Sequence, residues 1–282
     1  MPGDNTADGV RPHEIELAVV VKAYPAISAK NGEVVCLARI RTDLAAPEWV
    51  RLWPMKIRDA DPSLQFKKWD LIRGTAAASG ADKRPESMAP MLTTFRRTGT
   101  LASAHGWRDR RVLSDPLLRT FPQHLADHAL RKTSLANIVA GEALDLEFEK
   151  KPAALLLKQT TAAFEAAGGD MQSLFGDTQR PLEPIPVIGR LVMRFDGETE
   201  PRKLAIEDWE FWQTWRRWGR TYPSGFEDRL RQKWLGEMLA PTKDASVVIG
   251  NQFHAREQWA LLSVLWPPAA SDVDQGQLDL FG

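Results

Sequence analysis

The fold is decided by the stretch Gly32-Glu33-Val34-Val35-Cys36-Leu37-Ala38-Arg39-Ile40-Arg41. Its β-branched and apolar residues fit a pleated, half-buried surface, so we expect a strand here. A similar apolar run lies between Glu14 and Tyr24, and Asn31-Gly32 separates the two runs. An Asn-Gly pair between two such runs is a strong signal of a hairpin turn. The sequence therefore predicts two antiparallel strands at the start of the chain.

The strand pattern continues downstream. One side of the next run carries Trp49, Arg51 and Trp53, and apolar residues alternate with them. This alternation is typical of a half-buried strand, and a further strand is expected at 69–74. The first part of the chain is therefore predicted to be a small antiparallel β-sheet or barrel. Barrels of this kind often carry single-stranded nucleic acid or peptides, although fold alone does not give function.

The later part of the chain predicts a mixture of helices and strands. Helical periodicity is visible around 116–140, 153–167 and 226–239, and the apolar runs 246–250 and 259–266 predict a C-terminal hairpin. The predicted fold class is α+β, in which the sheet or barrel is followed by a mixed region with a Trp-rich helix. The expected parts are a flexible arm (1–12), a β-rich nucleic-acid-binding-like domain (13–112), an α+β domain (113–266) and a flexible tail (267–282).

Composition restricts the possible function classes. The chain has 282 residues, a formal net charge of zero and one cysteine, Cys36. A single cysteine excludes an intramolecular disulfide and a four-cysteine zinc site. The sequence has no signal-peptide pattern and no apolar run that could span a membrane, so we expect a cytoplasmic, nucleoid-associated protein. Because the net charge is zero, a nucleic-acid surface has to come from local charge asymmetry.

Residues 66–111 provide such an asymmetry. They contain ten basic and four acidic side chains, an excess of six positive charges, with aromatic residues between them. Basic residues interleaved with aromatic ones suit phosphate contacts and base stacking. The alternative is a solvated loop whose charges pair with acidic neighbours. The candidate nucleic-acid-binding residues of this stretch are Lys67, Lys68, Trp69, Arg84, Arg96, Arg97, Trp107 and Arg108.

A second candidate surface lies on the Trp-rich helix predicted at 206–220. Its four tryptophans are three residues apart, so on an α-helix they drift by about 60° per step and cover half of the circumference. The helix is therefore either packed between two layers, or some indoles face a ligand such as a nucleic-acid base. The basic residues beside the tryptophans are Arg216, Arg217 and Arg220.

Catalytic candidates flank the first tryptophan of this helix. Asp208 and Glu210 could hold Mg²⁺ or Mn²⁺ for phosphodiester hydrolysis, with His254 addressing the phosphate. Acidic residues at a helix N-terminus also stabilise the helix through its dipole, which is the alternative interpretation. The tip of the C-terminal hairpin adds Asn251 and Arg256 as nucleic-acid-binding candidates. An ordinary exposed turn is the alternative there.

The end of the chain carries an apolar peptide, Gln277-Leu278-Asp279-Leu280-Phe281, after a linker-like tail. Its apolar side chains have no neighbours in sequence to pack against, so we expect them to be buried in a partner's pocket. The peptide resembles the motif by which many bacterial replication and repair proteins bind the DNA polymerase sliding clamp. The resemblance implies that Gln277 hydrogen-bonds at the pocket mouth and that Asp279 stays solvated. The alternative is a frayed end that folds back on its own domain.

Three function classes follow from these features. The first is a DNA-processing or DNA-repair-associated protein, recruited to the sliding clamp, that binds single- or double-stranded DNA through basic and aromatic surfaces. If it is an enzyme, metal-dependent phosphodiesterase or nuclease chemistry is the leading class. The second is a non-catalytic clamp-binding adaptor or regulator of replication. The third, a nucleotide or small-molecule enzyme, has no phosphate-loop or nucleophile motif to support it.

Overall fold

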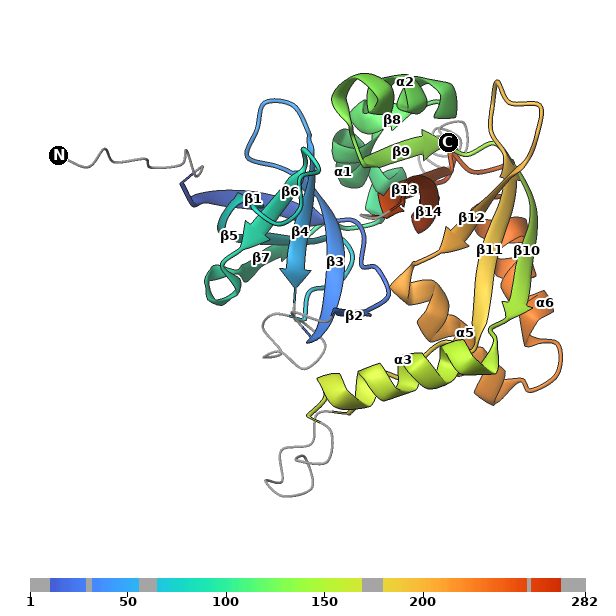
Figure 1. Ribbon diagram of the computed structural model, residues 1–282. Helices are drawn as coiled ribbons and strands as arrows, with labels where there is room; N and C mark the ends of the chain where they lie inside the picture. Colours follow the sequence, from blue (N-terminus) through green and yellow to red (C-terminus); the bar gives the residue numbers. More distant parts are fainter. Residues whose placement is uncertain (1–10, 29–31, 56–64, 169–179, 253–254, 270–282) are drawn as a thin grey trace.

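The structure is a computed structural model that describes residues 11–28, 32–55, 65–168, 180–252 and 255–269. Two lobes lie side by side, and α3 spans the foot of both (Figure 1). The strands are β1 (His13–Val19), β2 (Ala26–Ser28), β3 (Gly32–Arg41), β4 (Trp49–Met55), β5 (Asp70–Ala78), β6 (Ser87–Pro90), β7 (Arg96–Thr100), β8 (Leu118–Arg119), β9 (Leu135–Val139), β10 (Glu142–Lys150), β11 (Val187–Arg194), β12 (Arg202–Ile206), β13 (Ser246–Gln252) and β14 (Ala255–Leu265). The main helices are α1 (Ala104–Ser114), α2 (Phe121–Arg131), α3 (Ala153–Ala166), α5 (Trp209–Thr221) and α6 (Phe226–Arg231), which continues into the π-helical turn η5 (Gln232–Met238). The predicted α+β fold class is confirmed.

The first lobe is a closed barrel of five strands. Its order is β1-β3-β4-β6-β5, and β5 pairs back with β1. The pair β4–β6 is parallel and the other pairs are antiparallel. Numbered along the chain, the five strands follow the order 1-2-3-5-4 around the barrel. This is the strand order of the OB fold, a five-stranded Greek-key barrel.

The second lobe repeats the same strand order. Strands β10-β11-β12-β14-β13 lie side by side, and the pair β12–β14 is again parallel. The first strand of this barrel is bent: β10 pairs with β11, and the preceding segment β9 pairs with β13. Gly141 lies at the bend, where a Cβ atom would stand 2.0 Å from the carbonyl oxygen of Arg194. Glycine is therefore required for this barrel to close.

Three apolar clusters stabilise the fold. One fills the first barrel, one fills the second barrel, and the third lies between them. In the third cluster, Ala38 and Ile40 on the outer face of β3 share an apolar layer with Val248 and Leu262 of the second barrel. Burying a side chain the size of Ile40, Val248 or Leu262 stabilises a protein by about 1.5–3 kcal/mol. The interface therefore holds the two barrels in a fixed relation.

Helix α5 confirms the predicted Trp-rich helix and explains its tryptophan spacing. Trp212 is 4% exposed and belongs to the core of the second barrel, which Trp215 and Trp218 also contact. Trp209 packs instead against the core of the first barrel. A helix with apolar layers on two sides can bury indoles that wrap around its axis. Of the two interpretations of the spacing, packing between layers is therefore the one that the structure shows.

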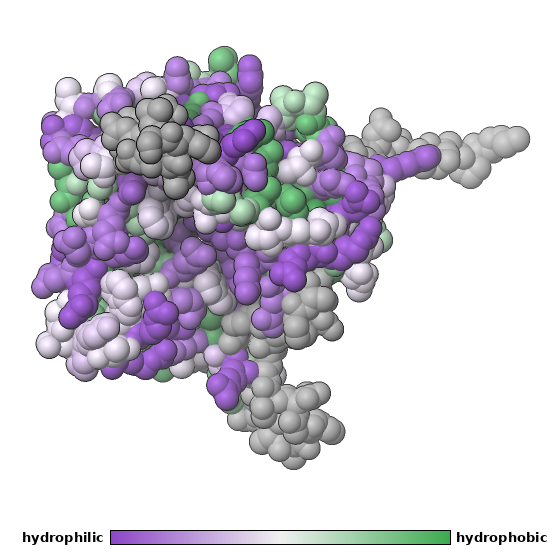
Figure 2. All heavy atoms as spheres, turned by 180° about the vertical axis from the view of Figure 1, so that it is seen from behind, coloured by the Kyte–Doolittle hydropathy of each residue, from purple (hydrophilic) through white to green (hydrophobic). Residues whose placement is uncertain are grey.

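One face of the molecule is mostly polar (Figure 2). On the face shown in Figure 2, hydrophilic residues dominate and apolar residues form scattered patches. Among the helices of the described residues, none combines the length and the apolar character needed to cross a bilayer.

Candidate nucleic-acid interface

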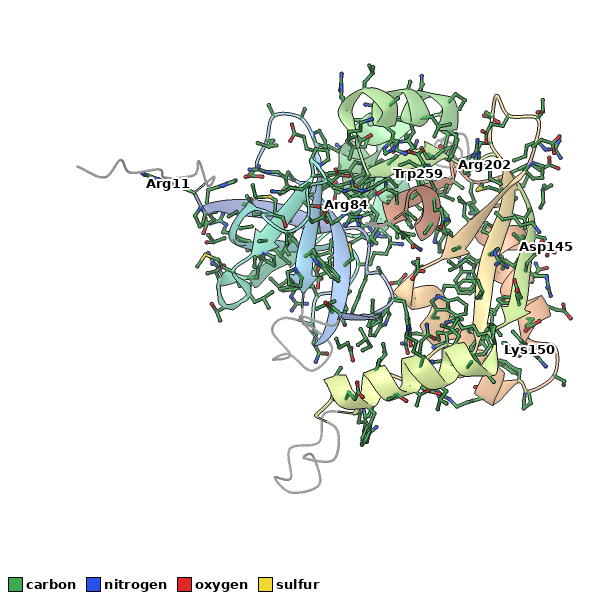
Figure 3. The ribbon with its side chains drawn as sticks, viewed as in Figure 1. Arg11, Arg84, Asp145, Lys150, Arg202 and Trp259 are labelled. Atoms are coloured by element: carbon green, nitrogen blue, oxygen red, sulfur yellow. The ribbon has the colours of Figure 1, made fainter. Side chains whose placement is uncertain are left out.

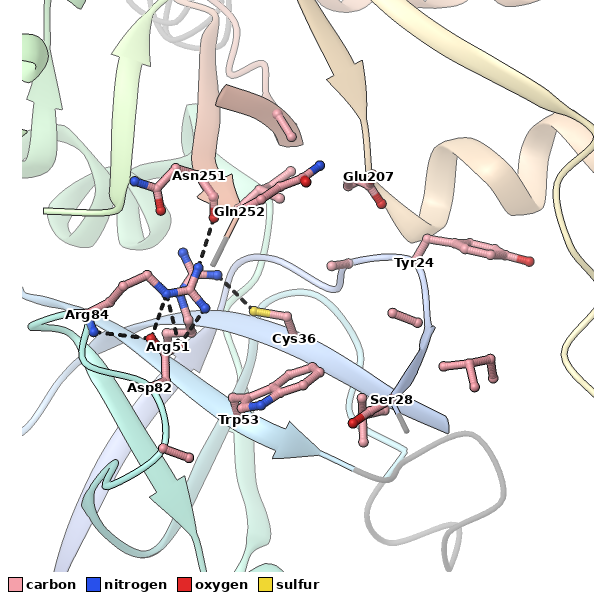
Figure 4. A pocket seen from close by; sticks show the side chains of 18 residues that line it. Tyr24, Ser28, Cys36, Arg51, Trp53, Asp82, Arg84, Glu207, Asn251 and Gln252 are labelled. Carbon is pink, nitrogen blue, oxygen red and sulfur yellow. Dashed lines mark hydrogen bonds and ion pairs between the residues drawn. The ribbon is translucent and has the colours of Figure 1, made fainter. Parts of the chain in front are cut away.

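A cleft of about 600 Å³ lies between the two barrels (Figure 4). The first barrel contributes the outer faces of β3 and β4, together with the loops 23–28 and 81–84. These loops connect its first to its second strand and its fourth to its fifth strand. In OB barrels, this face and these two loops bind oligonucleotides and oligosaccharides. The second barrel closes the cleft with the ends of β12 and β13 and with β14.

Trp53 is the aromatic residue of this face. On β4, Val50 and Leu52 point into the barrel core, so Trp49, Arg51 and Trp53 point outwards. Trp49 packs against the apolar layer between the barrels, whereas Trp53 is half-buried and lines the cleft. Figure 4 shows its indole on the first-barrel side of the cleft. The sequence alternation on this strand placed Trp49, Arg51 and Trp53 on one face, and the structure shows that this face points out of the barrel.

At one end of the cleft, two arginine side chains connect the two barrels through hydrogen bonds. The Nη1 atom of Arg51 donates to Cys36 Sγ at 2.9 Å, and its Nη2 atom donates to the carbonyl of Ser134 at 3.2 Å. The Nε atom of Arg84 donates to Asp82 at 2.9 Å, and its Nη1 atom donates to the carbonyl of Asn251 at 2.8 Å. Both arginines bridge the two barrels, so the cleft is formed before any ligand binds.

Glu207 lies where the cleft meets a second cavity of about 540 Å³ beneath α3, since its side chain lines both. Its backbone N–H donates to Leu261 at 2.8 Å, and its carbonyl accepts from the N–H of Tyr24 at 2.6 Å. Burial raises the pKa of the Glu207 carboxyl to about 7, although the positive charge of Lys151 opposes this shift. Both protonation states of Glu207 are therefore accessible near neutral pH.

The catalytic candidates lie in a different hollow. Asp208, Glu210, Lys67 and Lys68 line it together. Asp208 caps α5, since its Oδ1 accepts from the N–H of Glu210 at 2.7 Å and from that of Phe211 at 3.2 Å. Burial raises the pKa of Asp208 to about 6, which weakens it as a metal ligand. The described residues contain no group of three or more His, Cys, Asp or Glu side chains that could hold a metal ion. The Mg²⁺ or Mn²⁺ site stays a prediction.

Several nucleic-acid-binding candidates are used inside the protein. Lys68 Nζ donates to the carbonyl of Val264 at 3.1 Å and so connects the two barrels. Trp69 is 3% exposed and meets Trp107 edge-on, with ring centroids 5.9 Å apart. The guanidinium of Arg110 lies over both indoles. These aromatic rings therefore pack against each other and against a neighbouring cation.

The remaining candidates are dispersed. Arg96 and Arg97 are exposed on β7, whereas Arg216 donates to the carbonyl of Glu183. The other exposed basic candidates are Lys67, Arg108 on α1, and Arg217 and Arg220 on α5. Arg256, in β14, is partly buried. The structure thus gathers Arg84 and Asn251 at the cleft and does not bring the basic residues together on one surface. His254 and the peptide Gln277–Phe281 lie outside the described residues.

Sequence reasoning missed the cleft because its walls come from distant segments. Tyr24, Cys36, Trp53, Glu207 and Gln252 line it together. The sequence showed only the alternation that puts Trp53 on the same face as Trp49 and Arg51.

Two family models match the chain, one after the other along the sequence. Residues 13–116 match a domain of unknown function (DUF8758), and residues 123–281 match a domain of unknown function (DUF8757). The chain belongs to the DUF8757 family. Among curated proteins, no relative matches.

Several chains of solved structures match, and one of them is described here by its title. Its title reads "Structure and Conformational Change of a Replication Protein A Heterotrimer Bound to ssDNA", and its sequence is 10% identical to this chain. The alignment covers 98% of this chain and 70% of that chain, with a TM-score of 0.23. At this TM-score, the match carries no argument about the fold or the function of the DUF8757 protein.

Proposed function

We propose that this protein binds single-stranded DNA in the cleft between its barrels. The observation that carries the proposal is the position of Trp53. It stands on the outer face of β4, between the two loops that OB barrels use for binding, inside a cleft of about 600 Å³. An indole in such a place offers a stacking surface to any unpaired base.

The dimensions and charges of the cleft favour a short single strand. A cavity of this size matches the pockets that hold small ligands, so it accepts about one or two nucleotides and excludes a duplex. The two arginines that line the cleft, Arg51 and Arg84, already bond to groups of the protein. Few lysine or arginine side chains are therefore left there for phosphate. We expect binding to depend on stacking and to weaken only slightly with salt.

The C-terminal peptide adds a partner protein to this proposal. Gln277–Phe281 would bind the sliding clamp, as its resemblance to the clamp-binding motif implies, and would bring the cleft to replicating DNA. Ordering the peptide on binding costs conformational entropy, so micromolar affinity is expected. Cleavage of DNA is not part of the proposal, because Asp208 is occupied by its capping role.

The test is a binding titration with a labelled eight-nucleotide DNA strand. Trp53→Ala should weaken binding by about 1–3 kcal/mol, the value of one stacked base. Tyr222→Ala, an exposed aromatic at the end of α5, is the matched control and should bind like the unmodified protein. Equal affinities of all three proteins would contradict the proposal. Binding of an oligosaccharide in place of DNA would assign the cleft to the other ligand class of OB barrels.

A further inference from the structure

A further cavity, of about 480 Å³, lies between the first barrel and the segments α2 and β9. The first barrel lines it with residues 47–49, where β4 begins, and with residues 85–86, which precede β6. The other walls come from α2, from the residues around β8 and from the segment 133–136. None of its lining residues also lines the cleft that holds Trp53. The cavity is therefore a separate candidate site, and its size is that of a pocket for a small molecule.

Three side chains that line this cavity carry an unpartnered polar atom. The atoms are Glu86 Oε2, His124 Nε2 and Thr133 Oγ1, which are buried and have no hydrogen-bond partner within the described part of the chain. The His124 side chain as a whole is almost fully buried, at 2% exposure. A buried polar atom without a partner has lost its hydration and gained no hydrogen bond in return. Three such atoms around one cavity point to a ligand that supplies the missing bonds.

The three side chains form one cluster that the protein holds in place. The N–H of Ser134 donates to Glu86 Oε1 at 2.7 Å, and the hydroxyl of Ser134 donates to the same oxygen, so only Oε2 is left. The ring atom Nδ1 of His128 lies 2.6 Å from the carbonyl oxygen of Thr133. The rings of His124 and His128 have their centroids 6.4 Å apart. Thr133 is thus connected to Glu86 through Ser134 and to His124 through His128, and a ligand would meet a preformed set of groups.

The chemistry of these groups limits what can bind. An ionised carboxylate such as that of Glu86 only accepts hydrogen bonds, whereas the Thr133 hydroxyl donates and accepts. Burial, and then repulsion from His128, lower the pKa of His124 to about 4, so at pH 7 its neutral ring has one N–H and one acceptor nitrogen. An anion is repelled by the carboxylate, and an ammonium group cannot accept from the hydroxyl. An alcohol hydroxyl can pair with all three groups, because it both donates and accepts.

The rest of the lining suits an uncharged ring. Apolar surface comes from Trp49, Leu117, Leu135 and Ala136. The remaining charged side chains of the lining are Glu48, Arg119, Asp127 and Arg131, two of each sign, and Arg119 Nε lies 3.6 Å from the carboxylate of Asp127. Apolar walls with a few fixed polar groups are typical of sites for small ligands.

We infer that this cavity binds a sugar ring with adjacent hydroxyl groups, either as a free sugar or as the ribose of a nucleoside. The hydroxyls would bond Glu86, His124 and Thr133, and the carbon face of the ring would lie on the apolar wall. This site goes beyond the proposed binding of single-stranded DNA and does not depend on it, since the two cavities share no lining residue.

The experiment titrates the full-length protein with two matched pairs of probes at pH 7, followed by ligand-observed NMR. One pair is methyl riboside and its dideoxy analogue, and the other is adenosine and dideoxyadenosine. The members of each pair differ only in two adjacent hydroxyls, so any stacking of adenine in the DNA cleft cancels. In at least one pair, the hydroxylated member should bind about tenfold more tightly, which corresponds to the loss of two hydrogen bonds in the other. The pair that shows the preference distinguishes a free sugar from a nucleoside.

Thr133→Val tests the assignment of the site. It keeps the shape of the side chain and removes a hydroxyl that has no partner within the described residues, so the urea unfolding curve should not shift to lower urea concentration. The preference for the hydroxylated probe should nevertheless fall to about threefold or less. Thr98→Val, at an exposed position of β7, is the matched control and should keep the tenfold preference.

Glu86→Gln is the second test, and it decides the matter if Thr133→Val does not fold. Its amide oxygen can still accept from Ser134, but its NH₂ group cannot accept from the ligand, so the preference should fall in the same way. If neither pair shows hydroxyl-dependent binding at millimolar concentrations, the cavity holds water only and the inference is overturned. A tenfold preference that survives in both variants would also overturn it. Neither result affects the DNA-binding cleft, which the octamer titration with Trp53→Ala tests separately.

Discussion

The two barrels share one strand order, but the outer faces of their second and third strands differ. In the first barrel this face is partly covered by the other barrel, and it carries Trp53 into the cleft. In the second barrel the same face is more open, and opposite charges pair across its strands. Arg190 bonds Glu149 at 2.7 Å, and Lys203 bonds Glu147 at 2.7 Å.

This difference indicates that the strand order alone does not determine which face of a barrel binds a ligand. A face whose cations are already neutralised by neighbouring glutamates gains little from phosphate, because each new contact has to break an existing pair. A face that holds a half-buried indole in a preformed cleft loses little entropy when a base stacks on it. The ligand is therefore expected on the covered face and not on the open one.

The largest predicted effect concerns the way in which each barrel closes. The first strand of the second barrel turns at Gly141, whereas β1 of the first barrel contains no glycine. Gly141→Val should destabilise the protein by about 4–5 kcal/mol, because its Cβ would collide with the carbonyl of Arg194. Urea denaturation measures this loss. Gly80→Val is the control, since a Cβ there meets nothing within 4 Å, and a similar loss in both variants would show that closure does not depend on the bend.

A smaller difference between the barrels concerns their stability at acidic pH. His124 in the second barrel is 2% exposed and packs on Trp259, whereas His13 in the first barrel is exposed. Burial first, and then repulsion from His128, lower the pKa of His124 to about 4. Its folded pKa lies below its unfolded value of 6.5, so its contribution is complete above pH 6.5 and is lost as the pH falls towards 4.

This shift corresponds to about 3 kcal/mol of the free energy of unfolding. His124→Phe should therefore flatten the decline in stability between pH 6.5 and pH 4, as measured by urea unfolding at a series of pH values. The comparison uses the slope with pH, so a constant packing penalty from the phenylalanine does not affect it. An unchanged slope would mean that His124 does not control the acid sensitivity.

The smallest effect should come from the open face of the second barrel. Lys203→Ala removes a cation that Glu147 already neutralises, so the affinity for single-stranded DNA should change by less than about 0.5 kcal/mol. The labelled octamer titration measures it. A loss as large as that expected for Trp53→Ala would place the DNA on β11 and β12 instead of in the cleft.

The sequence predicted the elements better than it predicted the site. The alternation on β4 and the apolar runs around β1 and β3 predicted the strands of the first barrel. An alternation with a period of two can be recognised from neighbouring residues alone. The polar stretch after Gly250 was interpreted as a long hairpin tip, but β13 reaches Gln252 and β14 begins at Ala255. Pairing with β9 and β14 outweighs the polar character of these residues.

The residues of the site are brought together by contacts between distant segments, and such contacts leave no local pattern in the sequence. The basic residues in 66–111 suggested one surface, yet Lys68 and Arg84 bond to the second barrel. The proximity of Asp208 and Glu210 in the sequence suggested a metal site, which stays a prediction, and only the structure shows that Asp208 also caps α5. Only the packing of the two barrels brings Trp53 and Glu207 to one cleft, since they lie more than 150 positions apart in the sequence.

The most direct test of the central claim is amide hydrogen exchange with and without a short single strand of DNA. If the cleft binds the strand, exchange should slow in the loops 23–28 and 81–84 and at the cleft ends of β3 and β4. The amides of β11 should exchange as before. Slower exchange confined to β11 and β12, or no change anywhere at saturating DNA, would contradict the account.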